Sequence, residues 1–159
     1  SSQPIQLDAD RYEMLPLGKE VLAPYVKPDE HGKPMYRLPG TVAHPLPYLG
    51  YAPGAYLGRV VDLILKQDGP TVHLDRVYET DMAEGLKAMA REGHGIAFLP
   101  LSAVRKEVQS GKLVSAGQGR EMELDIRIYR ERPQPGVKTK RPTQAFWDSL
   151  SSIVHSRQS

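Results

Sequence analysis

The sequence contains no cysteine, no long hydrophobic run and no excess of charge of one sign. Without cysteine the chain can form no disulfide, zinc ribbon, iron–sulfur centre or thiol nucleophile. Its apolar runs are too short to span a bilayer, and the amino terminus has no basic-then-apolar secretory pattern. The 21 basic and 19 acidic residues nearly balance, which disfavours direct contact with nucleic acid. We therefore expect a soluble protein that works without thiols.

The composition is that of a folded domain. With 159 residues, 40% hydrophobic and 25% charged, the chain suits one ordinary domain or two small lobes, and disordered or collagen-like classes are excluded. The chain begins Ser1-Ser2-Gln3-Pro4 without a methionine. We therefore expect it to be a piece of a longer protein.

Hydrophobic patterning predicts an α/β fold. The runs 12–17 and 21–26 predict two strands separated by Gly18-Lys19-Glu20, and Pro16 and Pro24 favour edges or bulges. From Tyr48 strands and helices alternate, which predicts a parallel α/β unit. The predicted strands are 48–51, 72–78, 95–100 and 112–114, followed by 124–129.

Three predicted helices connect these strands, and a fourth closes the chain. The first follows Gly54 and has the apolar stripe Leu57, Val60, Val61, Ile64 and Leu65. Asp81 with Glu84 is expected to cap the second, which has Met82, Leu86, Met89 and Ala90 inward and ends at Gly93. Ser102 is expected to cap the third, with Leu101, Val104 and Val108 inward. The closing helix begins near Pro142 and carries Phe146, Trp147, Leu150, Ile153 and Val154.

Common catalytic and metal-binding patterns are missing from the sequence. No G-x-S-x-G motif occurs, and His31, His44, His73, His94 and His155 are not spaced as zinc ligands. Gly93-His94-Gly95 lies after a helix rather than before one, so it is interpreted as a turn and not as a dinucleotide-binding loop. We therefore expect no catalytic residue, no metal and no cofactor.

The corners between predicted strands and helices are the best candidates for a binding site, because open α/β sheets bind ligands at the carboxyl ends of their strands. The corner from Tyr51 to Tyr56 brings two tyrosines and free backbone N–H groups to a helix amino terminus, which favours a small anion. Glu79-Thr80-Asp81 offers a hydroxyl and carboxylates at the next corner. The alternative is equally open: Thr80 and Asp81 only cap a helix, and Tyr56 only packs.

Three segments carry a family resemblance. They are Tyr78 to Met82, the run Gly93-His94-Gly95-Ile96-Ala97-Phe98-Leu99-Pro100, and Val108 to Val114. Together they resemble the effector-binding domain of LysR-type transcriptional regulators, and Thr143 to Trp147 looks like that family's closing helix. Gly50 to Arg59 looks closest to the hypochlorite-responsive branch of the family.

The resemblance implies a periplasmic-binding-protein-like, Rossmann-like domain made of two subdomains. Residues 44–114 would be a complete second subdomain, 1–43 the trailing strands of a partial first one with a crossover, and 115–159 the return crossover, strand and closing helix. A small effector would bind in the cleft between subdomains, and the helix 54–66 would contribute to a homodimer or tetramer. The implied effector-binding residues are Tyr51, Ala52, Pro53, Gly54, Tyr56, Thr80, Asp81, Phe98 and Pro100.

The sequence also departs from the family pattern. A complete regulator has a helix-turn-helix and a linker helix upstream, and none is present here, so DNA would be bound only through domains outside this chain. The leading hypothesis is a cytoplasmic, non-enzymatic sensing domain for a small anionic effector. The alternatives are a fragment of a periplasmic solute-binding protein and an oxidant sensor that uses Met82 or Met89.

Overall fold

A computed structural model describes residues 12–131, and the predicted helix after Pro142 lies outside them. Residues 20–124 form one compact unit, and the outer strand ends 12–19 and 125–131 belong to a second. The elements in chain order are β1 (Tyr12–Val26), β2 (Leu46–Tyr51), α1 (Tyr56–Leu65), β3 (Leu74–Thr80), α2 (Ala83–Arg91), β4 (Ile96–Pro100), α3 (Leu101–Gln109), β5 (Val114–Ser115) and β6 (Met122–Glu131).

The sheet is mixed rather than wholly parallel. Its strand order is β3-β2-β4-β1-β5, with β6 paired to β1. Strand β2 is parallel to both β3 and β4, whereas β1 is antiparallel to β4 and to β5. The predicted alternation of strands and helices is confirmed. The predicted parallel unit holds for three strands only, because β1 lies between β4 and β5.

Strand β1 is continuous, so the prediction of two separate strands was wrong. Gly18 lies inside it with a φ of 120°, a conformation that glycine adopts without steric cost. The expectation that Pro24 lies at an edge or a bulge was also wrong, because this residue pairs with Phe98 in regular register in the sheet interior. The carbonyl of Pro24 accepts a hydrogen bond from the backbone N–H of Ala116, just past the end of the two-residue strand β5. The missing N–H therefore interrupts no ladder.

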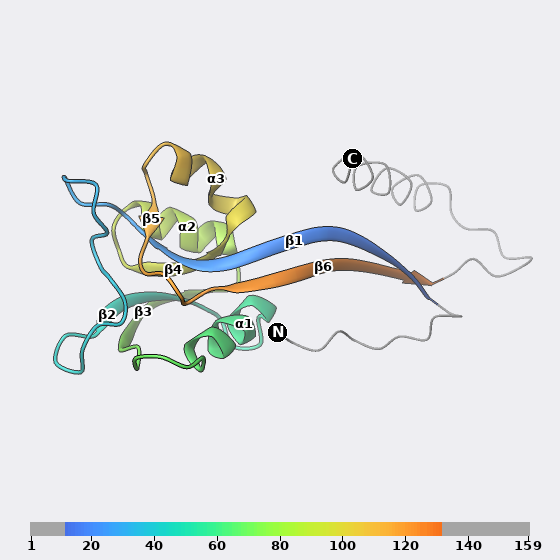
Figure 1. The fold of residues 1–159 in the computed structure, drawn as a ribbon, viewed down its shortest axis with the longest axis horizontal. Helices are drawn as coiled ribbons and strands as arrows, with labels where there is room; N and C mark the ends of the chain where they lie inside the picture. The colour runs from blue at the N-terminus through green and yellow to red at the C-terminus, as the bar shows by residue number, and fades with distance from the viewer. Residues whose placement is uncertain (1–11, 132–159) are drawn as a thin grey trace, which may run out of the picture. The chain divides into compact units, whose positions relative to one another are not determined.

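The helices of the 20–124 unit cover both faces of its sheet. Strand β3 lies on one side of β2 and β4 on the other. The chain therefore moves across the sheet in one direction through α1, from β2 to β3, and in the opposite direction through α2, from β3 to β4. Right-handed crossovers then place α1 and α2 on opposite faces. Figure 1 shows α1 on one side of the sheet and α2 and α3 on the other. The predicted stripe of α1 is confirmed, since Val60, Val61 and Ile64 are at most 1% exposed. Burying each such side chain stabilises the fold by roughly 1.5–3 kcal/mol.

Helix ends differ from the predicted caps in two of three cases. Helix α2 has Met82 rather than Asp81 as its N-cap, and α3 has Pro100 rather than Ser102. Two residues expected to lie inward are exposed: Met82 at the N-cap of α2 by 63%, and Val108 near the end of α3 by 39%. The predicted end of α2 is confirmed: Gly93 has a φ of 87°, and its N–H donates to the Ala90 carbonyl.

Candidate functional site

The carboxyl ends of the three parallel strands are joined by hydrogen bonds. Tyr51 ends β2 and lies in register with Thr80, the last residue of β3. The backbone N–H of Ala52 donates to the Thr80 carbonyl at 2.9 Å. On the other side, the Tyr51 hydroxyl donates to the carbonyl of Phe98 in β4 at 2.8 Å. The corners predicted from the sequence therefore lie together at the carboxyl end of these strands.

A cavity of about 360 Å³ opens at the first corner, between the end of β2, the start of α1 and β3. Predicted and unpredicted residues line it together. The predicted residues in its lining are Tyr51, Ala52, Pro53 and Gly54. The charged residues in its lining are Arg59, Asp62, Arg76 and Glu79, of which the sequence pointed to Glu79 as part of the next corner. The predicted residues Tyr56, Thr80, Asp81, Phe98 and Pro100 lie outside this lining.

The amino terminus of α1 is open at this cavity. Its N-cap is Ala55, which has no side-chain acceptor, and no acidic residue lies in its first turn. Gly54 makes the preceding turn with a φ of 87°. The first N–H groups of α1 thus keep the partial positive charge of a helix amino terminus.

Arg59 and Arg76 add two cations to the same corner. The Arg59 Nη1 donates to the Gly54 carbonyl at 2.8 Å, and its guanidinium lies 5.9 Å from the centre of the Tyr56 ring. This ring is 48% exposed, so it flanks the corner rather than packing in the core.

Arg76 crosses from β3 onto β2. Its Nη1 donates to the Tyr51 carbonyl at 2.8 Å and lies 3.9 Å from a Glu79 carboxylate oxygen, while its guanidinium is 5.3 Å from the Tyr48 ring centre. A Cβ at Gly50 would lie 2.6 Å from Arg76 Nη1, so a glycine there makes room for the guanidinium. Sequence reasoning missed Arg76 because its role depends on the pairing of β3 with β2, which the sequence does not give.

The tyrosines beside the cavity remain neutral near neutral pH. Burial, opposed by the positive charge of Arg76, raises the pKa of Tyr48 to about 12. Burial raises the pKa of Tyr51 still further. Because Tyr51 is 3% exposed and its hydroxyl is bonded to Phe98, its phenol supports the corner rather than transferring protons.

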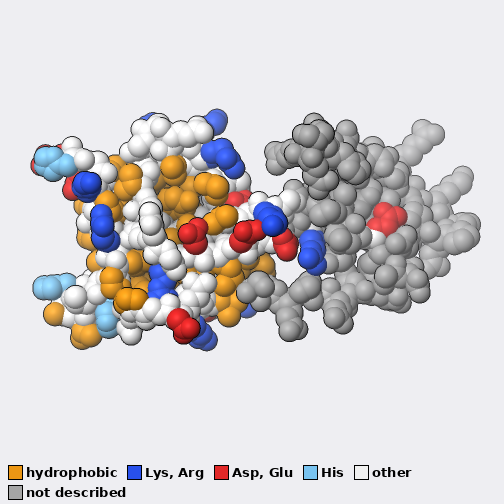
Figure 2. Space-filling view, in the orientation of Figure 1, with side chains coloured by type: hydrophobic (Ala, Val, Ile, Leu, Met, Phe, Trp, Pro, Cys, Tyr) orange, Lys and Arg blue, Asp and Glu red, His pale blue; other side chains and the backbone are white. Residues whose placement is uncertain are grey.

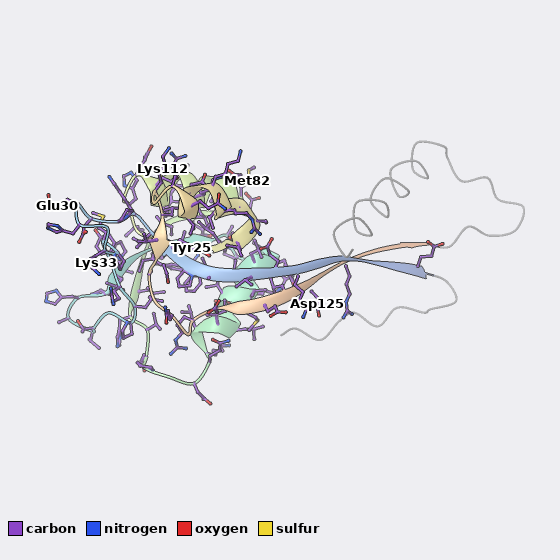
Figure 3. The ribbon with its side chains drawn as sticks, turned by 45° about the horizontal axis from the view of Figure 1, so that its top comes forward. Tyr25, Glu30, Lys33, Met82, Lys112 and Asp125 are labelled. Atoms are coloured by element: carbon purple, nitrogen blue, oxygen red, sulfur yellow. The ribbon has the colours of Figure 1, made fainter. Side chains whose placement is uncertain are left out.

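The predicted residues on β3, on β4 and just after β3 do not line the cavity. The Thr80 hydroxyl accepts a hydrogen bond from the Met82 N–H at 3.4 Å, and Asp81 is exposed. Phe98 is fully buried, so only its backbone reaches the corner, and Pro100 is the N-cap of α3. Met82 lies at the start of α2 (Figure 3).

Among residues 12–131 no group of three or more His, Cys, Asp or Glu side chains could hold a metal ion. No helix in this part of the chain is long and apolar enough to cross a membrane. On the face shown in Figure 2, the described Lys and Arg side chains are dispersed among acidic and apolar ones and form no continuous basic surface.

Comparisons with known proteins agree on one family. Residues 2–152 match the family model for the LysR substrate binding domain. The chain is 29% identical over 143 residues to the HTH-type transcriptional regulator YjiE of Escherichia coli K12, covering 89% of this chain and 45% of that protein. It is 28% identical over 142 residues to the HTH domain-truncated transcriptional regulator QseD of Escherichia coli O157:H7, covering 89% and 56%. The chain thus spans about half the length of these curated relatives.

Solved structures show the same fold. The apo regulatory domain of HypT from Salmonella typhimurium superimposes with a TM-score of 0.77 at 24% identity, covering 91% of this chain and 66% of that one. The bromide-bound form of that domain gives a TM-score of 0.75.

Proposed function

Because the chain belongs to the LysR substrate-binding domain family, we propose that it is the sensing part of a transcriptional regulator and binds a small monoanionic effector at the corner between β2 and α1. The observation that carries this proposal is the 360 Å³ cavity onto which the uncapped start of α1 opens beside Arg59 and Arg76. Charge-assisted hydrogen bonds from guanidinium groups and helix N–H groups are suited to a carboxylate.

The lining also limits the charge of the effector. Asp62 and Glu79 lie in the same cavity as the two arginines, so the four side chains have no net charge. A dianion would be repelled by these carboxylates, whereas one carboxylate can pair with the arginines at little cost. We therefore expect a monocarboxylate, or an amino acid whose ammonium group meets an acidic side chain.

Binding would act on transcription through a change of population. An effector that binds one conformation of the regulator more tightly than another shifts the balance by its difference in affinity. The signal would pass to helix-turn-helix domains outside this chain, in the cytoplasm, with α1 contributing to a contact between two copies. Leu63 on α1 is 40% exposed, which supports an apolar contact made by this helix.

The relatives favour regulation over solute transport. Both curated relatives carry the name of a transcriptional regulator. The gene sequence upstream of Ser1 separates the two functions: a helix-turn-helix supports regulation, and a secretory signal peptide would contradict it.

The binding proposal is tested by titrating the chain with a panel of small monocarboxylates and amino acids by isothermal calorimetry. We expect at least one binder, and the Arg59→Gln variant should weaken it about tenfold because one charge-assisted hydrogen bond is lost. The matched control is Arg91→Gln, which removes an exposed arginine at the far end of α2 and should leave affinity unchanged. A panel without any binder, or equal losses in both variants, would overturn the proposal.

A further inference from the structure

A second cavity lies at the opposite end of α1 and of the parallel strands. Its volume is about 550 Å³, within the range of ligand pockets. Three chain segments enclose it: the loop at Leu38-Pro39, the stretch from Pro70 to Val72 after α1, and the turn from Ser115 to Arg120. Backbone hydrogen bonds fix two of these segments beside the starts of β2 and β3, since His73 donates to Pro39 and Leu46 donates to His73.

Arg120 is a buried, rigidly held cation in this cavity. It is only 7% exposed, and its guanidinium binds the carbonyl end of α1 and the turn that follows. Its Nη1 donates to the carbonyls of Ile64 at 3.2 Å and Gln67 at 2.8 Å, and its Nη2 donates to that of Pro70. These bonds use three of the five N–H groups of an arginine. The donors are thus already aligned before any ligand arrives.

One remaining donor of Arg120, the Nε–H, is accessible. Its Nε–H and one Nη2–H have no acceptor within residues 12–131, yet no fully buried side-chain nitrogen or oxygen in that range lacks a partner. The Nε atom, which has no partner in that range, therefore reaches solvent, and the second cavity is the space that Arg120 lines.

The rest of the lining separates this cavity from the candidate site. Arg37 supplies a second, exposed cation, and no acidic residue is present in the lining, in contrast to Asp62 and Glu79 at the first corner. Much of the remaining surface is apolar, from Leu38, Pro39 and Val72. Two guanidinium groups without a carboxylate partner, facing an apolar wall, suit a ligand with one anionic end and a compact hydrocarbon body.

We propose that the cavity between Arg37 and Arg120 is a second ligand site, specific for a small monocarboxylate with an aliphatic or aromatic body. The carboxylate pairs with the two guanidinium groups, and the hydrocarbon body packs against Leu38 and Val72. This site is independent of the proposed effector corner, because it lies at the carboxyl end of α1 whereas the corner lies at its amino end.

The test uses the whole 159-residue chain and nuclear magnetic resonance. Sodium phenylacetate and sodium hexanoate are titrated to about 10 mM, since weak ligands of this size bind near the millimolar range. We expect at least one of them to shift the amide signals of Val72 and Gly117, which line the cavity. Inorganic phosphate, which has no hydrocarbon body, and benzyl alcohol, which has no charge, should shift them much less.

Paired variants assign the binding to this cavity. Arg37→Gln removes an exposed side chain and should weaken the binding that Val72 and Gly117 report at least about fivefold. Arg59→Gln, at the other end of α1, should leave that binding unchanged, so failure of the proposed effector corner and failure of this site are distinguishable. The proposal is overturned if neither carboxylate shifts these signals, if phosphate binds equally well, or if Arg37→Gln has no effect.

Discussion

Ser102 in the first turn of α3 donates both its backbone N–H and its hydroxyl to the carboxylate of Glu20, which lies 82 positions earlier in the chain on β1. The backbone hydrogen bond measures 3.1 Å. Ser102 therefore does not cap its own helix, as its sequence position predicted. A carboxylate from a distant strand caps α3 instead and is favoured there by the helix dipole. The same contact ties the start of α3 to β1.

Removing this distant cap should destabilise the fold. We expect Glu20→Ala to lower the free energy of unfolding by about 1–2 kcal/mol, the usual cost of losing a helix cap with a charged acceptor. Chemical denaturation measures the change, with Glu30→Ala as control because Glu30 lies in an exposed loop. Ser102→Ala in the Glu20→Ala background should add little. Full additivity of the two losses would show that the residues act separately.

Gly95 of the Gly93-His94-Gly95 turn is expected to tolerate no side chain. A Cβ at this position would lie 2.6 Å from the backbone carbonyl oxygen of Pro47, an atom that cannot move without shifting β2. Gly95→Ala should therefore cost about 2–4 kcal/mol of stability. At Gly50 the same distance is to the flexible guanidinium of Arg76. Gly50→Ala should cost less and chiefly weaken effector binding, by displacing Arg76 from Tyr51. Similar stability losses in both variants would contradict this explanation.

The sequence predicted the structure correctly where a pattern of neighbouring residues determines it. The stripe of α1 placed Val60, Val61 and Ile64 in the core, and Gly93 ended α2 as expected, because helix periodicity and left-handed glycine caps depend only on neighbouring residues. The corner at Tyr51 to Gly54 could be predicted for a similar reason. Strand-to-helix turns in α/β units place their residues at a common edge.

Features that depend on the pairing of strands far apart in the sequence could not be predicted from local patterns. Arg76 reaches the candidate site only because β3 lies in register with β2, and Glu20 caps α3 only because β1 runs beside β4. The position of β1 also made the sheet mixed, and the short β5 allowed Pro24 in its interior. None of these pairings can be predicted from the hydrophobic pattern of neighbouring residues.

Acid should weaken the contact between α2 and α3 through Lys87. Its ammonium lies 3.2 Å from carboxylate oxygens of both Glu84 and Glu107 and donates to the Ala103 carbonyl at 3.0 Å. Burial tends to lower the pKa of Lys87, but hydrogen bonds to the two carboxylates outweigh it and the pKa is raised. The backbone N–H of Glu107, opposed by burial, together with Lys87 lowers the pKa of the Glu107 carboxyl.

The sign of the pH effect follows from these shifts. A carboxyl whose pKa is lower in the folded state stabilises the fold above its ordinary pKa of 4.5 and loses that contribution as the pH falls through the folded value. The raised pKa of Lys87 gives stability that is fully present in the acid and neutral range and is lost only at strongly alkaline pH, so it does not change the acid dependence. Unfolding measured across the acid range should thus show a smaller acid-induced loss in Lys87→Met than in the original chain. An unchanged acid dependence would contradict a role for this cluster.

The oxidant-sensing alternative makes its own prediction at Met82. With no cysteine in the chain, methionine sulfur is the first target of a mild oxidant. Met82 is 63% exposed beside Thr80, whereas Met89 on the same helix is half-buried. Mass spectrometry of peptides after brief exposure to hypochlorite should find the sulfoxide at Met82 well before Met89. If oxidation of Met82 is a signal, it changes the affinity for the monocarboxylate effector in the original chain and not in Met82→Leu, with Met89→Leu as the matched control. Equal changes in all three proteins would leave Met82 with no sensing role.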